Sequence, residues 1–232
     1  MKRILVSCFV LILLLSGCHV PEPRILAQDI VYGVTENNVL YIPEREESVP
    51  YYCFDSDYGV LCVRKDYVRT NVMFNDISFG GSYYLNSNLD LWLDKAVFDS
   101  FDSNVKNYVE NVEIKIRSKD FFDVETIERQ VFVLSLSELG IEDNRTVNLG
   151  RKIDGVRDFD LAGEQWLRDA FDSDINRAWC YSESGYGPEY TYEGLCVRPC
   201  FVINKETEVE WDSSVSGYVI KQQPDKTAAV CF

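Results

Sequence analysis

Short apolar runs separated by polar turns dominate the chain after residue 50, and many of them alternate apolar and polar positions with the period of a β-strand. The segment from Tyr51 to Tyr67 contains two such runs on either side of the turn Asp55–Gly59, which predicts a β-hairpin. Further strands are expected at residues 109–116, 130–136, 178–182, 195–203 and 218–220.

Two longer segments have the spacing of amphipathic helices. Asn88 can cap a helix in which Trp92 and Val97 share one apolar stripe. Residues 162–171 favour a second helix, and a further helical turn is expected after Phe101. Short antiparallel strands combined with two to three helices predict an α+β fold.

One domain accounts for the folded part of the chain. We assign it to residues 51–210, a length that is ample for a hydrophobic core. Within it, residues 141–160 are polar and punctuated by glycine, so we expect a long surface loop there. Residues 211–232 then form a C-terminal tail, and Cys231 is expected to fasten its end.

The first residues have the pattern of an export signal. Two basic residues precede an apolar run at 4–15, which is shorter than the roughly 20 residues that span a bilayer. The motif Leu-Ser-Gly-Cys at 15–18 looks like a bacterial lipobox, which predicts removal of residues 1–17 and acylation of Cys18. The acyl chains would anchor the protein to the outer side of a bacterial membrane. An ordinary secretory signal or an uncleaved anchor is the alternative.

Residues 18–50 are expected to form a tether between the lipid and the domain. This segment contains four prolines and a charged cluster at 44–47, a composition typical of extended linkers. Residues 29–34 and 39–42 are apolar enough to pair as a small hairpin within it.

The strong acidic balance excludes nucleic acid as a partner. The whole chain has 23 basic and 38 acidic residues, and removal of Lys2 and Arg3 with the signal leaves 21 basic residues and a net charge of −17. Binding to a phosphate backbone requires a cationic surface, and no cluster of more than two basic residues follows the signal. Neutral glycans and basic proteins are compatible partners.

Histidine-dependent catalysis is excluded as well. The single histidine, His19, adjoins the acylated cysteine, outside the expected domain, so it cannot activate a serine or cysteine nucleophile there. The sequence also lacks phosphate-binding, dinucleotide-binding and zinc-protease motifs. We therefore assign no catalytic residue, no cofactor and no metal site.

Six cysteines remain in the mature chain besides the acylated one: Cys53, Cys62, Cys180, Cys196, Cys200 and Cys231. An even number outside the cytosol suggests disulfides. Cys53 and Cys62 flank the turn of the first hairpin, which favours a cross-strand bridge. Cys180 can pair with Cys196 or with Cys200 if residues 195–203 form one strand, and the remaining cysteine can then meet Cys231.

The loop from Ser184 to Gly194 is the most suggestive binding surface in the sequence. Tyr186, Tyr190 and Tyr192, with Glu189 beside them, can stack on sugar rings or anchor a protein contact. The alternative is a hairpin whose tyrosines cover the neighbouring sheet. The glutamates around this loop, which include Glu183 and Glu193, leave a carboxylate-dependent glycoside hydrolase as a competing function.

Several motifs resemble those of one bacterial family. The pattern W-x-x-S at 179–182, V-R-P-x-F-x-x-N at 197–204, Trp92-Leu93 and the strand V-F-V-L-S-L at 131–136 are similar to the family known as domain of unknown function 6273. The resemblance implies a C-type-lectin-like α+β domain at a cell surface. Cys180 and Cys200 depart from the family's usual residues and suggest a disulfide-stabilised variant.

The sequence as a whole favours a lipid-anchored, extracytoplasmic module that binds a glycan or a protein, or that serves a purely architectural role at the surface. This interpretation depends on export, which is indicated by the order of basic residues, apolar run and cysteine at the start of the chain. The ligand is not specified by any motif.

Overall fold

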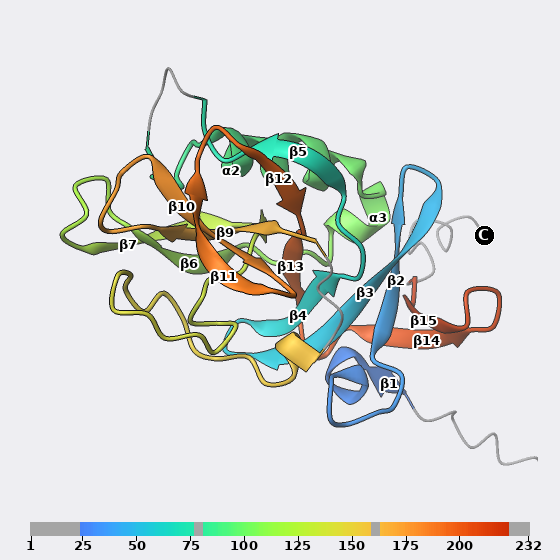
Figure 1. Cartoon of the computed structure of the whole chain (residues 1–232). Helices are drawn as coiled ribbons and strands as arrows, with labels where there is room; N and C mark the ends of the chain where they lie inside the picture. Colours follow the sequence, from blue (N-terminus) through green and yellow to red (C-terminus); the bar gives the residue numbers. More distant parts are fainter. Residues whose placement is uncertain (1–23, 77–80, 159–162, 223–232) are drawn as a thin grey trace, which may run out of the picture.

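The computed structural model describes residues 24–76, 81–158 and 163–222. Strands account for 42% of the chain and helices for 13%, and there is one helix of 13 residues. The expected α+β, C-type-lectin-like fold with two to three helices is therefore wrong. The molecule is built mainly from β-sheet (Figure 1).

The larger sheet has eight strands in the order β1-β14-β15-β2-β3-β4-β13-β8. The predicted hairpin is confirmed near its centre, where β3 and β4 pair from Tyr51↔Arg64 to Ser56↔Gly59. The bounds are β1 (Ile25–Leu26), β2 (Val39–Glu44), β3 (Glu47–Ser56), β4 (Gly59–Arg64), β8 (Val131–Phe132), β13 (Cys200–Ile203), β14 (Glu208–Asp212) and β15 (Gly217–Ile220).

Segments from both ends of the described chain complete this sheet. In β2, Leu40 and Ile42 are fully buried and alternate with partly exposed neighbours, so the strand has a core-facing side of its own. It pairs with β3 on one side and, in parallel, with β15 on the other. The folded part thus extends beyond residues 51–210 in both directions, through segments expected to be a tether and a tail.

The expected small hairpin between residues 29–34 and 39–42 does not form. Residues 39–42 belong to β2, which pairs with β3 and β15 instead. The preceding segment contains a short 3₁₀ helix, η1 (Ala27–Ile30), whose Ala27 and Ile30 are buried.

A second sheet has five strands in the order β11-β10-β9-β12-β5. The bounds are β5 (Arg69–Met73), β9 (Gln165–Ala170), β10 (Arg177–Ser182), β11 (Gly185–Tyr190) and β12 (Gly194–Val197). β9 lies between β10 and β12, and all six of its residues are buried. The expected helix at 162–171 is therefore wrong. A strand that is buried on both faces lacks the alternation of apolar and polar residues by which a strand is usually recognised.

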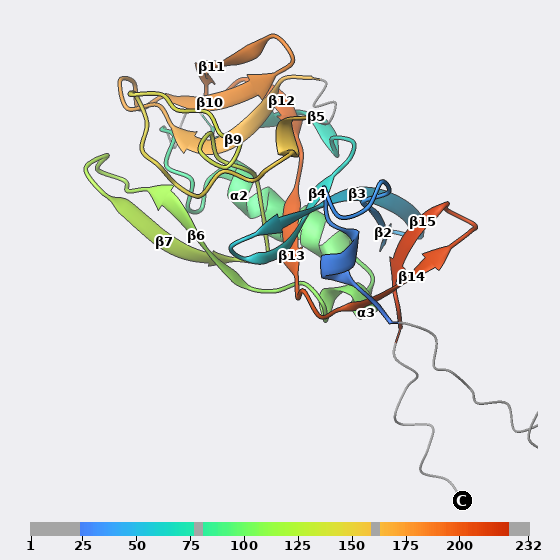
Figure 2. The ribbon, with the colours of Figure 1, turned by 90° about the horizontal axis from the view of Figure 1, so that it is seen from below.

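The segment 195–203 links the two sheets. It forms two strands, not the single strand expected, because the chain leaves the second sheet at Val197 and enters the larger sheet at Cys200. Arg198 and Pro199 lie between them, and Pro199 has no N–H to donate to a ladder. In Figure 2 this connection runs from β12 directly into β13.

The helix packs on the larger sheet. Its N-cap is Ser87 rather than Asn88, because the Ser87 Oγ accepts a hydrogen bond from the Asp90 N–H at 3.1 Å. Phe101, just after the helix, packs edge-on against Phe201 with 5.1 Å between ring centroids. Its successive parts are α2 (Asn88–Trp92), the π-type turn η2 (Leu93–Val97) and the 3₁₀ turn η3 (Phe98–Ser100).

The remaining elements are short. They are the one-turn helix α3 (Ser103–Lys106), the antiparallel pair β6 (Val112–Arg117) and β7 (Val124–Arg129), and the 3₁₀ turn η4 (Val156–Asp158). β6 confirms the strand expected at 109–116. Between β8 and β9 runs the long loop expected near residues 141–160, and this loop forms one wall of the site described next.

Candidate ligand groove and its buried support

An open groove with a volume of about 1020 Å³ lies between three segments that are distant in sequence. They are the β3–β4 turn, strand β6 and the loop of residues 137–154, and Tyr32 adds a further wall. We refer to this site as the groove. A concave surface of this size is the default place to look for a bound ligand.

Charged groups of both signs line the groove. The carboxylates are Asp55, Asp57, Glu113, Glu142 and Asp154, and the cations are Lys115, Arg151 and Lys152. Arg151 and Asp57 form an ion pair of 3.0 Å between the loop and the turn. Both side chains are mostly exposed, so solvent keeps this pair weak and a ligand can replace it at little cost.

Two tyrosines give the groove fixed aromatic surfaces. The Tyr32 hydroxyl donates to Asp158 Oδ2 at 2.8 Å, and the Tyr58 hydroxyl donates to Glu138 Oε1 at 3.1 Å. The Tyr32 ring lies against the backbone of Gly155, which has a φ of +81° and no room for a Cβ. Because each ring is held at its hydroxyl end, its orientation is set before any ligand arrives.

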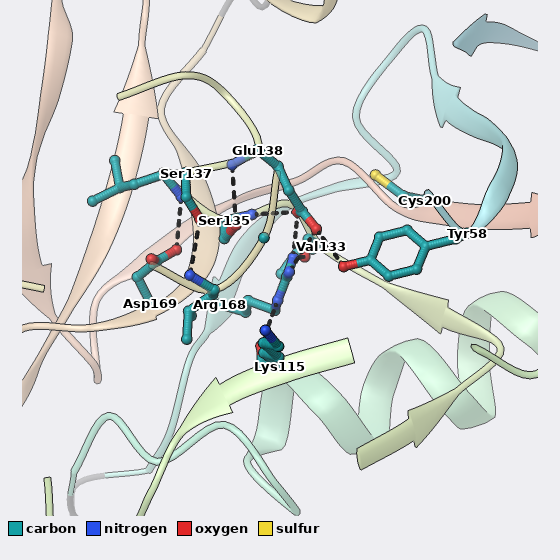
Figure 3. Close-up of polar contacts among 12 residues, drawn as sticks. Tyr58, Lys115, Val133, Ser135, Ser137, Glu138, Arg168, Asp169 and Cys200 are labelled. Atoms are coloured by element: carbon teal, nitrogen blue, oxygen red, sulfur yellow. Dashed lines mark hydrogen bonds and ion pairs between the residues drawn. The ribbon is translucent and has the colours of Figure 1, made fainter. Parts of the chain in front are cut away.

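Below the groove, Tyr58 joins a buried ion pair between β9 and the loop (Figure 3). The Arg168 guanidinium donates to Glu138 Oε2 at 2.6 Å and to Oε1 at 2.7 Å, in a two-pronged arrangement. The side chains of Arg168 and Glu138 are 0% and 1% exposed. Burial raises the pKa of Tyr58 to about 12, and Glu138 adds to this, so its hydroxyl stays a hydrogen-bond donor.

Arg168 also joins β6 and the segment that follows β8 to the loop. Its Nη1 donates to the Val133 carbonyl at 2.8 Å and its Nε to the Lys115 carbonyl of β6 at 3.0 Å. Burial alone would lower the pKa of Arg168, but the attraction and hydrogen bonds of Glu138 outweigh it and raise that pKa above its ordinary value. The guanidinium is therefore a permanent positive charge that positions β6, β9 and the groove loop together.

Glu138 is placed by a reciprocal pair of hydrogen bonds with Ser135. The Ser135 N–H donates to Glu138 Oε2 at 2.9 Å, and the Glu138 N–H donates to Ser135 Oγ at 3.3 Å. This is the hydrogen-bond pattern of a capping box. Ser137 Oγ then accepts from the Leu149 N–H at 3.0 Å, which ties the far end of the groove loop to the same turn.

Asp169, next to Arg168 in β9, is also fully buried. Its Oδ2 accepts a hydrogen bond from the Leu136 N–H at 2.9 Å. Burial raises the pKa of Asp169 to about 7, although the neighbouring charge of Arg168 and the Leu136 N–H act in the opposite direction. This carboxyl therefore changes its charge near neutral pH, directly below the groove loop.

The tyrosines favoured by the sequence lie elsewhere, on and beside the β10–β11 hairpin. Tyr186 is 44% exposed, and its ring centroid is 5.6 Å from that of the buried Trp179. Tyr190 stacks on Tyr192 at 5.2 Å, and the Arg177 guanidinium lies 4.1 Å from the Tyr190 centroid. These rings cover the sheet and keep exposed edges, so the hairpin is a second candidate face.

The loop glutamates do not meet in the groove. Glu189 lies in β11 opposite Ala178, Glu183 lies between β10 and β11, and Glu193 follows β11, and none of the three lines the groove. Within the described ranges, no three metal-binding side chains are grouped so that they could hold an ion.

The structure shows the five cysteines of the described ranges in their reduced form: Cys53, Cys62, Cys180, Cys196 and Cys200. Cys180 in β10 and Cys196 in β12 lie on either side of β9. Two strand spacings separate them by about 10 Å, farther than a disulfide spans. This separation argues against the pairing with Cys196, one of the two alternatives left open for Cys180. Cys200 lies in the other sheet, and Cys18 and Cys231 lie outside the described residues.

Sequence reasoning missed the buried ion pair under the groove. The signal for Glu138 was present, since Ser135-Leu-Ser-Glu138 has the spacing of a capping box. The signal for Arg168 was a charged pair, Arg168-Asp169, inside an apolar run. Such charges indicate a buried partner when the run is a strand, but the helical interpretation of residues 162–171 placed them on a solvent-facing side.

The fold and the groove define a β-rich domain of two larger sheets and one two-stranded sheet, with an open, polar groove walled in part by tyrosines. Residues 58–205 match the family model described as "Domain of unknown function (DUF6273)", and because the match covers more than half of the chain, the protein belongs to that family. No curated protein and no solved structure matches the chain. In the part of the chain that the structure describes, no helix has the length and apolar character required to cross a bilayer.

Proposed function

We propose that this protein is an exported, lipid-anchored binding module that holds a neutral glycan in the groove. The observation that carries the proposal is the groove itself, with its volume of about 1020 Å³, its two fixed tyrosine rings and its polar side chains of both signs. The resemblance of residues 15–18 to a lipobox supports acylation of Cys18 and a place on the outer side of a bacterial membrane.

The chemistry of the lining favours hydroxyl-rich, uncharged ligands. Sugar hydroxyls can donate to carboxylates such as Asp55 and accept from cations such as Lys152, and sugar rings can stack on the tyrosines. Five carboxylates against three cations disfavour an anionic polymer, as does the net charge of the whole chain.

A glycan array compares three variants with the wild-type protein. The groove variant, Arg151→Ala/Lys152→Ala, removes two exposed cations from the lining. The charge-matched control, Lys95→Ala/Lys221→Ala, removes two exposed lysines that do not line the groove. The hairpin variant is Tyr186→Ala/Tyr190→Ala/Tyr192→Ala.

We expect the groove variant to lose at least about tenfold in affinity for a neutral glycan that the wild type binds, since each charge-assisted hydrogen bond contributes more than 1 kcal/mol. The control and hairpin variants should bind as the wild type does. Loss of binding in the hairpin variant alone would move the ligand face to β10–β11. Absence of binding by the wild type to every neutral glycan would refute the proposal.

Export and acylation are tested separately. Cells that make the full chain are labelled with an alkyne-bearing fatty acid, and the membrane fraction is compared with that of Cys18→Ser. We expect label and membrane association in the wild type and loss of both in the variant. If neither protein carries the label and both partition equally between membrane and soluble fractions, the lipid anchor is excluded. This result would leave the groove assay unaffected.

A further inference from the structure

Cys53 in β3 and Cys62 in β4 are direct cross-strand partners. The Cys53 N–H donates to the Asn38 carbonyl at 2.9 Å, and the Cys53 carbonyl accepts from the Tyr32 N–H at 2.8 Å. Both of these backbone groups therefore point away from β4. The Cys53–Cys62 pair is for that reason a non-hydrogen-bonded pair of the antiparallel ladder.

The ladder on either side confirms this assignment. The Lys65 N–H donates to the Pro50 carbonyl at 2.9 Å, so positions 50 and 65 form a hydrogen-bonded pair. Hydrogen-bonded and non-hydrogen-bonded pairs alternate along antiparallel strands, and Cys53–Cys62 lies three register positions further on. A pair that lies an odd number of register positions from a hydrogen-bonded pair is itself non-hydrogen-bonded. The ladder therefore gives the same assignment as the backbone contacts of Cys53.

Pairs of this kind bring side chains close together. Opposite Cα atoms in non-hydrogen-bonded pairs are about 4.5 Å apart, which lies within the span of about 4.4–6.8 Å that a disulfide bridges. Cys53 and Cys62 project from the same face of the sheet and are both fully buried. A bond between their sulfurs requires rotation of the side chains and leaves the strand register in place.

We propose that Cys53 and Cys62 form a disulfide when the chain folds in the presence of a small-molecule or protein disulfide. One cysteine thiolate attacks that disulfide, forms a mixed disulfide and releases one thiol. The second cysteine then attacks the first cysteine's sulfur and releases the second thiol. Two cysteine thiols are oxidised and one external disulfide is reduced to two thiols, so protons and electrons balance.

Cys200 is the other cysteine of this sheet that could pair with Cys62, but its side chain lies on the opposite face of the sheet. It is opposite Val63, the residue after Cys62, and successive residues of a strand point to opposite faces. Its thiol donates to the Arg198 carbonyl at 3.7 Å. Pairing of Cys62 with Cys200 would require one strand to turn over, so the register selects Cys53 as the partner.

The burial of Cys53 and Cys62 determines when the disulfide can form. Burial raises the pKa of the Cys62 thiol well above its ordinary value, and the contact with Cys53 adds to this. The folded, reduced protein therefore offers neither access nor a thiolate to an external disulfide. The bond has to form before the hairpin is covered, during folding, and not by oxidation of the finished molecule.

Peptide mapping after refolding tests the proposal on the full chain. The protein is reduced and unfolded in urea, refolded in a mixture of oxidised and reduced glutathione, treated with iodoacetamide and digested with trypsin. Because no lysine or arginine lies between Arg45 and Arg64, one peptide, residues 46–64, contains both cysteines. We expect this peptide to be about 2 Da lighter than its reduced form and to carry no alkyl group.

Two variants make the result specific. Cys200→Ala should leave the light, unalkylated peptide 46–64 unchanged, and Cys62→Ala should return this peptide with Cys53 alkylated or joined to glutathione. Wild-type protein folded fully reduced and exposed to oxidised glutathione afterwards should keep both thiols. Two results would overturn the proposal. One is recovery of peptide 46–64 with both cysteines alkylated after oxidative refolding, and the other is recovery of this peptide joined to another peptide of the chain.

Discussion

Replacing Asp169 by asparagine removes a carboxyl that is fully buried below the groove loop. Burial raises its pKa from 3.8 to about 7 in the folded protein, so folding favours the protonated form. The contribution to stability is complete below pH about 4 and is lost as the pH rises through about 7. A difference of about 3 pKa units at about 1.4 kcal/mol each corresponds to about 4 kcal/mol.

The asparagine side chain keeps the shape of the carboxyl and still accepts from the Leu136 N–H, but it has no charge to acquire. The free energy of unfolding is measured by urea denaturation of wild type and Asp169→Asn at pH 4.5, 6 and 8. We expect the difference, variant minus wild type, to increase by about 3 kcal/mol from pH 4.5 to pH 8, because about 1 kcal/mol of the effect already lies below pH 4.5. Other titrating groups cancel in this difference.

Asp66→Asn, at an exposed position, is the control, and its difference from wild type should stay within about 0.5 kcal/mol at all three pH values. A flat difference for Asp169→Asn as well, within about 1 kcal/mol, would refute the reasoning. It would mean that the attraction of Arg168 keeps the carboxyl ionised in spite of its burial.

Two further substitutions probe the support of the groove. Arg168→Met leaves the Glu138 carboxylate buried without its partner and should cost about 3–5 kcal/mol in urea denaturation, whereas a loss below about 1 kcal/mol would contradict the role of the ion pair. Gly155→Ala forces a side chain into the Tyr32 ring at a φ of +81° and should cost about 1–3 kcal/mol in thermal unfolding. Gly187→Ala, where a Cβ meets open space, should change stability by less than about 1 kcal/mol, and equal effects of the two glycine changes would argue against close packing at Gly155.

Local patterns predicted the elements that depend on neighbouring residues. The hairpin around Asp55–Gly59 was predicted from alternation and turn composition, and it forms as β3 and β4. The helix after Ser87 was predicted from one apolar stripe, and its existence is confirmed although its cap lies one residue earlier. In both cases the signal and the structure lie within about ten residues of sequence, where periodicity is informative.

The larger errors concern long-range pairing. Residues 162–171 look helical because a strand buried on both faces has no polar alternation to display. Residues 39–44 look like part of a linker because their partners, β3 and β15, include one strand almost 180 residues away. The groove walls likewise come from three distant segments, so no local motif marks them.

The first and last strands of the described residues pair within one sheet, and this affects where a stable fragment of the protein can begin and end. The match at residues 58–205 omits β1, β2, β3, β14 and β15, which are five of the eight strands of the larger sheet. A fragment cut at those limits would leave the whole length of β4 with an unpaired edge, a template for aggregation. We therefore expect soluble production of residues 58–205 of this protein to require the flanking strands as well.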